Sequence, residues 1–107
     1  MADQHEPVLR QAVLDGLAVR AAGAYADATY GRGGHAAAVL AALGPAGRLL
    51  VLDRDPQALA HAHAHLGADA RVAVCAGNFA DLGTHLRALG WEGVDGVLFD
   101  LGVSSPQ

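Results

Sequence analysis

Lysine is absent from this chain of 107 residues, and all seven basic side chains are arginines scattered along the sequence. Eleven side chains are acidic, so the formal net charge is −4. Proteins that bind nucleic acid normally present a basic face that neutralises phosphate groups. The charge therefore excludes an extensive nucleic-acid surface here, and we expect most of any such surface to lie outside this chain.

Other absences narrow the class of protein further. Cys75 is the only cysteine, which excludes an internal disulfide and indicates a reducing compartment, the cytoplasm. No apolar run approaches the roughly 20 residues of a membrane span. Residues 1–6 lack the basic start and apolar core of a signal peptide. The length fits one domain, or part of one.

Apolar stretches recur at similar intervals, with a turn and a helical pattern between them. Residues 48–53 form a continuous apolar run ending in Asp53, which is typical of a strand buried on both faces. Asp55 is suited to cap the next helix, with Pro56 at its first position. We expect strands at 25–29, 48–53, 72–75 and 94–100, and helices at 7–17, 34–43, 56–66 and 81–89.

This alternation predicts an α/β fold with a parallel sheet, because right-handed crossovers place helices on both faces. Ligands of such sheets bind beyond the carboxyl ends of the strands. Asp27, Asp53 and Asp100 lie at or near strand ends, and a glycine turn follows the first strand. We therefore expect all four features on one rim of the sheet.

The glycine turn contains Gly31, Gly33 and Gly34 and leads into an Ala-rich helix. Glycine permits positive φ and close approach of a ligand to the backbone, and the helix N-terminus offers amide donors. The spacing of Gly31, Gly33 and Ala36 fits a loose dinucleotide pattern, and Asp53 is placed to accept from a ribose diol. His35, just inside the helix, either contacts the ligand or lies on the rim.

The choice of ligand depends on Asp27. A carboxylate beside the turn disfavours the pyrophosphate of a nicotinamide cofactor and suits a cationic ligand, such as the sulfonium of S-adenosylmethionine. Phe79 either stacks on an adenine or covers the core, and the residues alone favour the core. Asp100 either faces the reacting end of the ligand or caps a turn.

Three histidines, His61, His63 and His65, alternate with alanine in the expected third helix. Only His61 and His65 share a helix face, and no further ligand is evident, so a solvated face is favoured over a metal site. We expect Cys75 to be a small strand residue rather than a nucleophile, and Trp91 to cover one end of the core.

Several longer motifs resemble one known family, the bacterial 16S rRNA cytosine-N4 methyltransferases. The motifs are His-Glu-Pro-Val-Leu at 5–9, Asp-Ala-Thr-Tyr-Gly-Arg-Gly-Gly-His at 27–35, Asp-Arg-Asp-Pro at 53–56 and Phe-Asp-Leu-Gly-Val-Ser-Ser-Pro-Gln at 99–107. The resemblance covers nearly the whole chain. Two departures are mild: Tyr30 stands where the family often has phenylalanine, and Ala28 where it often has glycine.

The resemblance implies a Rossmann-like methyltransferase fold, S-adenosylmethionine as cofactor, and N4 methylation of a cytosine in the decoding region of 16S rRNA. Cytosine N4 is a poor nucleophile, so an acceptor must orient its N–H groups, and Asp100 or a carbonyl near residues 104–106 is the candidate. The cofactor contacts that it implies are Gly33, Gly34, His35, Asp53, Phe79, Asp100 and Gln107.

Members of that family continue well past the last motif, so residues 1–107 resemble an N-terminal, cofactor-binding part with only the first four strands. We expect the unpaired edge of the fourth strand to be covered by another copy or by rearranged ends. We also expect this part alone to bind cofactor weakly and to methylate nothing. Two other functions stay open: an NAD(P)-dependent oxidoreductase and a non-catalytic nucleoside-binding module.

Overall fold

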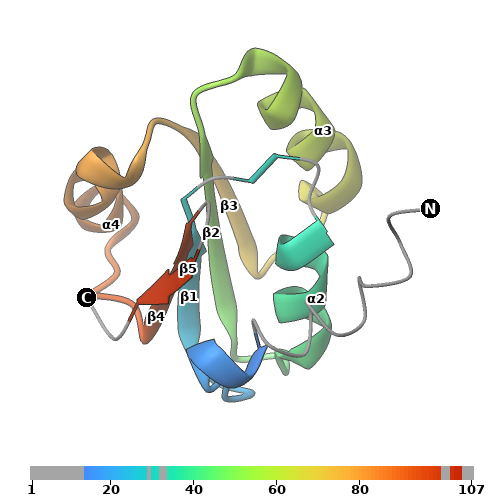
Figure 1. Cartoon of the computed structure of the whole chain (residues 1–107), viewed down its shortest axis with the longest axis vertical. Coiled ribbons are helices and arrows are strands. Elements are labelled where there is room, and N and C mark those ends of the chain that lie inside the picture. The colour runs from blue at the N-terminus through green and yellow to red at the C-terminus, as the bar shows by residue number, and fades with distance from the viewer. Residues whose placement is uncertain (1–13, 29, 32–33, 100–101, 105–107) are drawn as a thin grey trace.

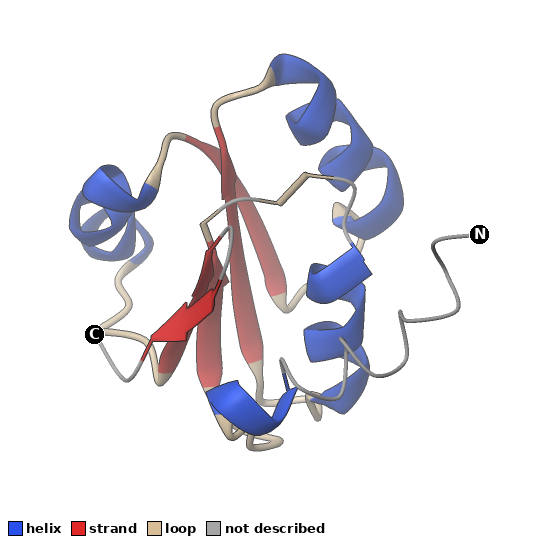
Figure 2. Ribbon diagram, in the orientation of Figure 1, coloured by secondary structure: helices blue, strands red, loops and turns tan. Residues whose placement is uncertain are grey.

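A computed structural model describes residues 14–28, 30–31, 34–99 and 102–104. Residues 14–17 are helical, within the helix expected at 7–17, and the rest of that helix lies outside the described residues. The elements that follow are shown in Figures 1 and 2. They are β1 (Ala24–Asp27), α2 (Gly34–Ala42), β2 (Arg48–Asp53), α3 (Pro56–Leu66), β3 (Val72–Ala76), a short 3-10 helix (Phe79–Asp81), α4 (Leu82–Leu89), β4 (Gly96–Phe99) and β5 (Gly102–Ser104).

The helix ends follow from local sequence. Asp55 caps α3, because its side chain accepts from the backbone N–H of Gln57 at 2.9 Å and Pro56 occupies the first turn. Helix α4 ends at Leu89 and is followed by Gly90, whose φ of 76° is in the left-handed region. Within the described ranges, no helix is long and apolar enough to cross a membrane.

The sheet has the order β3-β2-β1-β4-β5, and its first four strands are parallel. Strand β2 lies inside the sheet, and its residues 49–52 are at most 1% exposed. Leu49 and Val51 face α2 and α3, whereas Leu50 and Leu52 face α4. Figure 1 shows these helices on opposite sides of the sheet. The predicted α/β fold, with helices on both faces, is therefore confirmed.

Strand β5 was not predicted as a strand. It pairs antiparallel with β4, in the register Leu98↔Val103. The pairing satisfies backbone groups that β4 would otherwise leave open, so the end of the chain covers this edge. This is one of the two arrangements that we expected, and self-association through the edge stays a prediction.

Asp95 joins the beginning of β4 to the beginning of β1. One of its carboxylate oxygens accepts from the backbone N–H of Ala24 at 2.8 Å, and its own N–H donates to the Ala24 carbonyl. The other carboxylate oxygen pairs with the Arg20 guanidinium at 2.8 Å. These contacts fix β4 beside β1 across a sequence separation of 71 residues.

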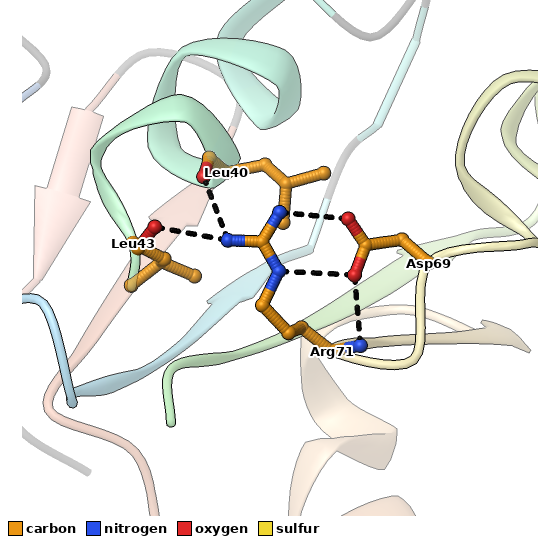
Figure 3. A network of polar contacts seen from close by, with 4 residues as sticks. All are labelled: Leu40, Leu43, Asp69 and Arg71. Carbon is orange, nitrogen blue, oxygen red and sulfur yellow. Dashed lines mark hydrogen bonds and ion pairs between the residues drawn. The ribbon is translucent and has the colours of Figure 1, made fainter. Parts of the chain in front are cut away.

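Arg71 connects the loop before β3 with the C-terminal end of α2 (Figure 3). Its guanidinium donates to the backbone carbonyls of Leu40 and Leu43 at 3.3 and 2.9 Å, and to both carboxylate oxygens of Asp69. These contacts satisfy carbonyls that a helix end leaves without intrahelical partners. The hydrogen bonds from Arg71 lower the pKa of Asp69 to about 2.

Candidate functional site

The rim formed by the carboxyl ends of β1, β2 and β3 holds the described part of the predicted site. Strand β1 ends at Asp27 and β2 at Asp53, on neighbouring strands of the sheet. The turn after β1 contains Gly31 at φ +59°, and a Cβ placed there would meet no atom within 4 Å. Gly31 is therefore required by backbone conformation, as predicted, while the space beside it remains open.

Asp53 links three loops at this rim. Its carboxylate accepts from the backbone N–H of Gly31 at 3.0 Å through Oδ2 and from that of Asp55 at 2.9 Å through Oδ1. Its backbone carbonyl accepts from the N–H of Gly77 at 3.0 Å, in the loop after β3. Each carboxylate oxygen has two acceptor sites, so Asp53 keeps capacity for a further donor such as a hydroxyl group.

A pocket of about 220 Å³ opens beside Asp53. Its lining residues are Gly31, Asp53, Asp55, Gln57, Ala58 and His61. A larger pocket of about 540 Å³ includes Arg48, Val72 and Trp91, at the opposite ends of β2 and β3. The smaller pocket is the candidate site, because it combines the glycine turn with the strand-end carboxylate.

Asp27 lies deeper than expected. It ends β1 as predicted, but its exposed fraction is 1%, and the residues after it, Ala28 and Tyr30, are also buried. Ala28 and Tyr30 stay beside the neighbouring strands, since the N–H of Ala28 donates to the Leu98 carbonyl of β4 and that of Tyr30 to the Leu52 carbonyl of β2. Burial, followed by the charge of Asp27, raises the pKa of Tyr30 above its usual 10.0.

Phe79 is 45% exposed, so the interpretation of Phe79 as a core residue is wrong. The reason lies in the loop after β3. Gly77 adopts φ +152°, and Asn78 caps the 3-10 helix that begins at Phe79, with a reciprocal hydrogen bond from the backbone N–H of Asn78 to Asp81. This capped loop holds Phe79 just past the carboxyl end of β3. Stacking of Phe79 on an adenine stays a prediction.

Among the other predicted contacts, Gly34 and His35 form the exposed first turn of α2. Their backbone amides lie at a helix N-terminus, which favours an anionic group. Gly33, Asp100 and Gln107 lie outside the described residues, so their roles stay predictions.

His61 and His65 share a face of α3 as predicted, although His61 is half-buried rather than fully solvated. His61 and His65 stack with ring centroids 3.9 Å apart, and His65 Nδ1 donates to the His61 carbonyl, while His63 is exposed. Across the described part of the chain, no three potential metal-ligating side chains cluster.

The sequence analysis missed a hydrogen bond between the Tyr30 hydroxyl and His61 Nδ1, 2.7 Å apart. It joins the glycine turn to α3 across 31 residues. No local pattern could have revealed this contact.

Cys75 is a small residue of β3 and Trp91 covers part of the core, as predicted: both are partly buried against the core on the α4 side of the sheet. That Cys75 is not a nucleophile stays a prediction.

Comparison with known proteins adds independent support for the fold. The crystal structure of fibrillarin from Aeropyrum pernix, in complex with natively bound S-adenosyl-L-methionine, superimposes on this chain with a TM-score of 0.61 and a sequence identity of 21%. The match covers 78% of this chain and 35% of fibrillarin. At this identity the likeness concerns the fold alone, and it agrees with the Rossmann-like arrangement.

Sequence relatives are much more similar. The "Ribosomal RNA small subunit methyltransferase H" of Xanthomonas euvesicatoria pv. vesicatoria is 57% identical over 103 residues, covering 96% of this chain and 30% of that protein. The protein of the same name from Coxiella burnetii is 50% identical over 106 residues, covering 98% and 34%. The chain thus spans about a third of the length of these relatives. A family model matches residues 2–107, and the chain belongs to the MraW methylase family.

Proposed function

We propose that this chain forms the cofactor-binding part of an S-adenosylmethionine-dependent methyltransferase that acts on the RNA of the small ribosomal subunit. The finer proposal is that the whole protein methylates N4 of a cytosine in the decoding region of 16S rRNA, in the cytoplasm. The observation that carries the cofactor assignment is Asp53, which holds the glycine turn and borders an open pocket. Membership of a methylase family supports the reaction type.

The residues around the pocket fit this cofactor. Asp53 has acceptor capacity for a ribose diol, and the exposed ring of Phe79 offers a surface for adenine. The amides of Gly34 and His35, at the start of α2, suit the carboxylate of the methionine moiety. The buried charge of Asp27 favours a cation over a pyrophosphate in the same crevice. This last point argues against a nicotinamide cofactor.

S-adenosylmethionine, when bound, supplies an electrophilic methyl group on a sulfonium. The N4 lone pair of cytosine is delocalised into the ring, so residues of the protein must orient the N4 amine. We propose Asp100 as the acceptor that holds an N–H of this amine and so turns the lone pair toward the methyl group. The target base must leave its stack to enter the site.

Isothermal titration calorimetry of this chain with S-adenosylhomocysteine and with NAD tests the cofactor assignment. We expect binding of S-adenosylhomocysteine only. Phe79→Ala removes the stacking surface and should weaken binding by roughly 10-fold or more, on the scale of one base stacked on an aromatic ring. Leu89→Ala is the matched control, because Leu89 is also a large exposed apolar residue, at 38%. Tighter binding of NAD, or equal effects of the two variants, would refute the assignment.

The RNA target needs a separate experiment. Small ribosomal subunits that lack the modification are incubated with a tritiated methyl donor and either this chain or a protein of the relatives' full length. Digested RNA is then examined by mass spectrometry. We expect N4-methylcytidine with the full-length protein and no transfer by residues 1–107 alone. Methylation at another position of the base would overturn the N4 assignment, and turnover by the short chain would overturn its predicted inactivity.

A further inference from the structure

Tyr30 connects helix α3 to the glycine turn through its side chain and its backbone. It immediately precedes Gly31, it is 5% exposed, and its backbone N–H donates to the Leu52 carbonyl at 3.2 Å. Its hydroxyl lies 2.7 Å from His61 Nδ1, and the two rings are inclined at 52° with centroids 5.5 Å apart. The backbone of Tyr30 is thus fixed to β2, and its side chain is fixed to α3.

The Tyr30 hydroxyl and His61 Nδ1 can each donate or accept, so the direction of this hydrogen bond depends on the tautomer of His61. In either direction, the contact gives the Tyr30 hydroxyl a partner. Removal of His61 would leave a hydroxyl on a buried ring without this partner, which is costly.

His61 is itself held from its other side. Its ring stacks on that of His65 at a centroid distance of 3.9 Å and an interplanar angle of 13°. His65 Nδ1 in turn donates to the His61 carbonyl at 2.9 Å, which orients the second ring. His61 also lines the pocket that contains Gly31 and Asp53. Its ring is therefore a fixed support at the border of the candidate site.

We propose that His61 is a positioning residue of the cofactor site, acting through the Tyr30 hydroxyl. By holding Tyr30 it keeps the Gly31 bend in place, and the Gly31 amide in turn orients the Asp53 carboxylate toward a ribose diol. This role rests on the proposed function. In this role the Tyr30 hydroxyl makes a contact that a phenylalanine at the same position could not make.

The test compares His61→Ala, Tyr30→Phe, the double variant and His61→Asn. Asparagine places a polar atom where His61 carries Nδ1, so it should restore the contact. His63→Ala is the control, because His63 is exposed on the same helix two residues away. Alanine is a strong helix former, so α3 should persist in both alanine variants, and circular dichroism checks this.

The first readout needs no ligand. In ¹H–¹⁵N spectra, the Gly31 amide signal should shift and its hydrogen exchange should accelerate in His61→Ala and Tyr30→Phe, but not in His63→Ala. The second readout is the dissociation constant for S-adenosylhomocysteine. We expect it to rise about 3- to 10-fold in each single variant, the scale of one hydrogen bond, and no further in the double variant. His61→Asn should remain within about 2-fold of wild type.

The two readouts separate this role from the proposed function. If His61→Ala leaves both the Gly31 amide and the affinity as His63→Ala does, the positioning role is overturned. If the wild-type protein binds no S-adenosylhomocysteine, the proposed function fails, but the Gly31 amide signal still tests the positioning role. An unchanged signal in His61→Ala overturns the link through Tyr30, and a shifted signal supports it. Additive losses in the double variant would show that His61 does not act through Tyr30.

Discussion

Replacement of Asp53 by asparagine separates the structural role of this side chain from its role in binding. The carboxylate accepts from two backbone amides, one on each oxygen. Asparagine keeps one oxygen and places an NH₂ group against the other N–H, so one hydrogen bond to a charged acceptor is lost. Such a bond contributes about 1.5–3 kcal/mol when shielded. Because Asp53 is only partly buried, we expect about 1 kcal/mol.

Urea unfolding followed by circular dichroism measures this loss, which corresponds to a fall in Tm of about 4–8 °C for a domain of this size. Calorimetry with S-adenosylhomocysteine measures the second effect. There we expect affinity to fall roughly 10-fold or more, since the ribose loses a charged acceptor. Glu92→Gln is the control: it removes the same charge from an exposed side chain that makes no hydrogen bond with any residue in the described ranges. Equal stability of the two variants would refute the role of Asp53 as a link between loops.

Three further predictions concern the scaffold. Leu50→Ala, at a fully buried position of β2, should cost about 2–5 kcal/mol in urea unfolding, and a loss below about 1 kcal/mol would contradict the packing described. Gly90→Ala should cost about 1–2 kcal/mol through its left-handed φ alone, while Gly83→Ala inside α4 should be neutral or stabilising. The pKa of Asp69 is about 2 in the folded protein against a usual 3.8, so its contribution to stability is present above about pH 4 and is lost as pH falls toward 2. Asp69→Asn should therefore destabilise the protein at pH 7 and differ less from wild type at pH 2, and an equal difference at both pH values would contradict this assignment.

The interior elements could be predicted closely because their signals are local. Strand β2 has the predicted bounds, since four consecutive apolar residues that end in Asp53 are typical of a strand covered on both faces. Helix α3 also has the predicted bounds, since Asp55 and Pro56 mark its start and Gly67 follows its end. The bounds of the outer strands differ from those predicted. Strand β3 extends one residue beyond the predicted 72–75, to Ala76. Strand β4 begins at Gly96 rather than near Val94, and Asp95 before it serves as a link to Ala24.

The site was harder to predict because its contacts are long-range. The sequence could place Asp53 at a strand end, but not its hydrogen bond to the Gly31 amide. Likewise the pairing of Tyr30 with His61 depends on how α3 packs beside the glycine turn. Exposure could not be predicted either. Asp27 is more buried than expected because strands pair with β1 on both sides, and Phe79 is more exposed because it lies in a capped 3-10 helix after β3.

The contact between Asp95 and Ala24 has a consequence for the order in which the strands fold together. Strands β1, β2 and β3 follow one another along the chain with one helix between neighbours, so they can pair by closing short loops. Strand β4 must instead return past all of them, because the contact of Asp95 with Ala24 closes a loop of 71 residues. Closing the longer loop costs more chain entropy and slows the step. The side of the sheet between β1 and β4 is therefore expected to form last, after the strand ends around Asp53 have come together.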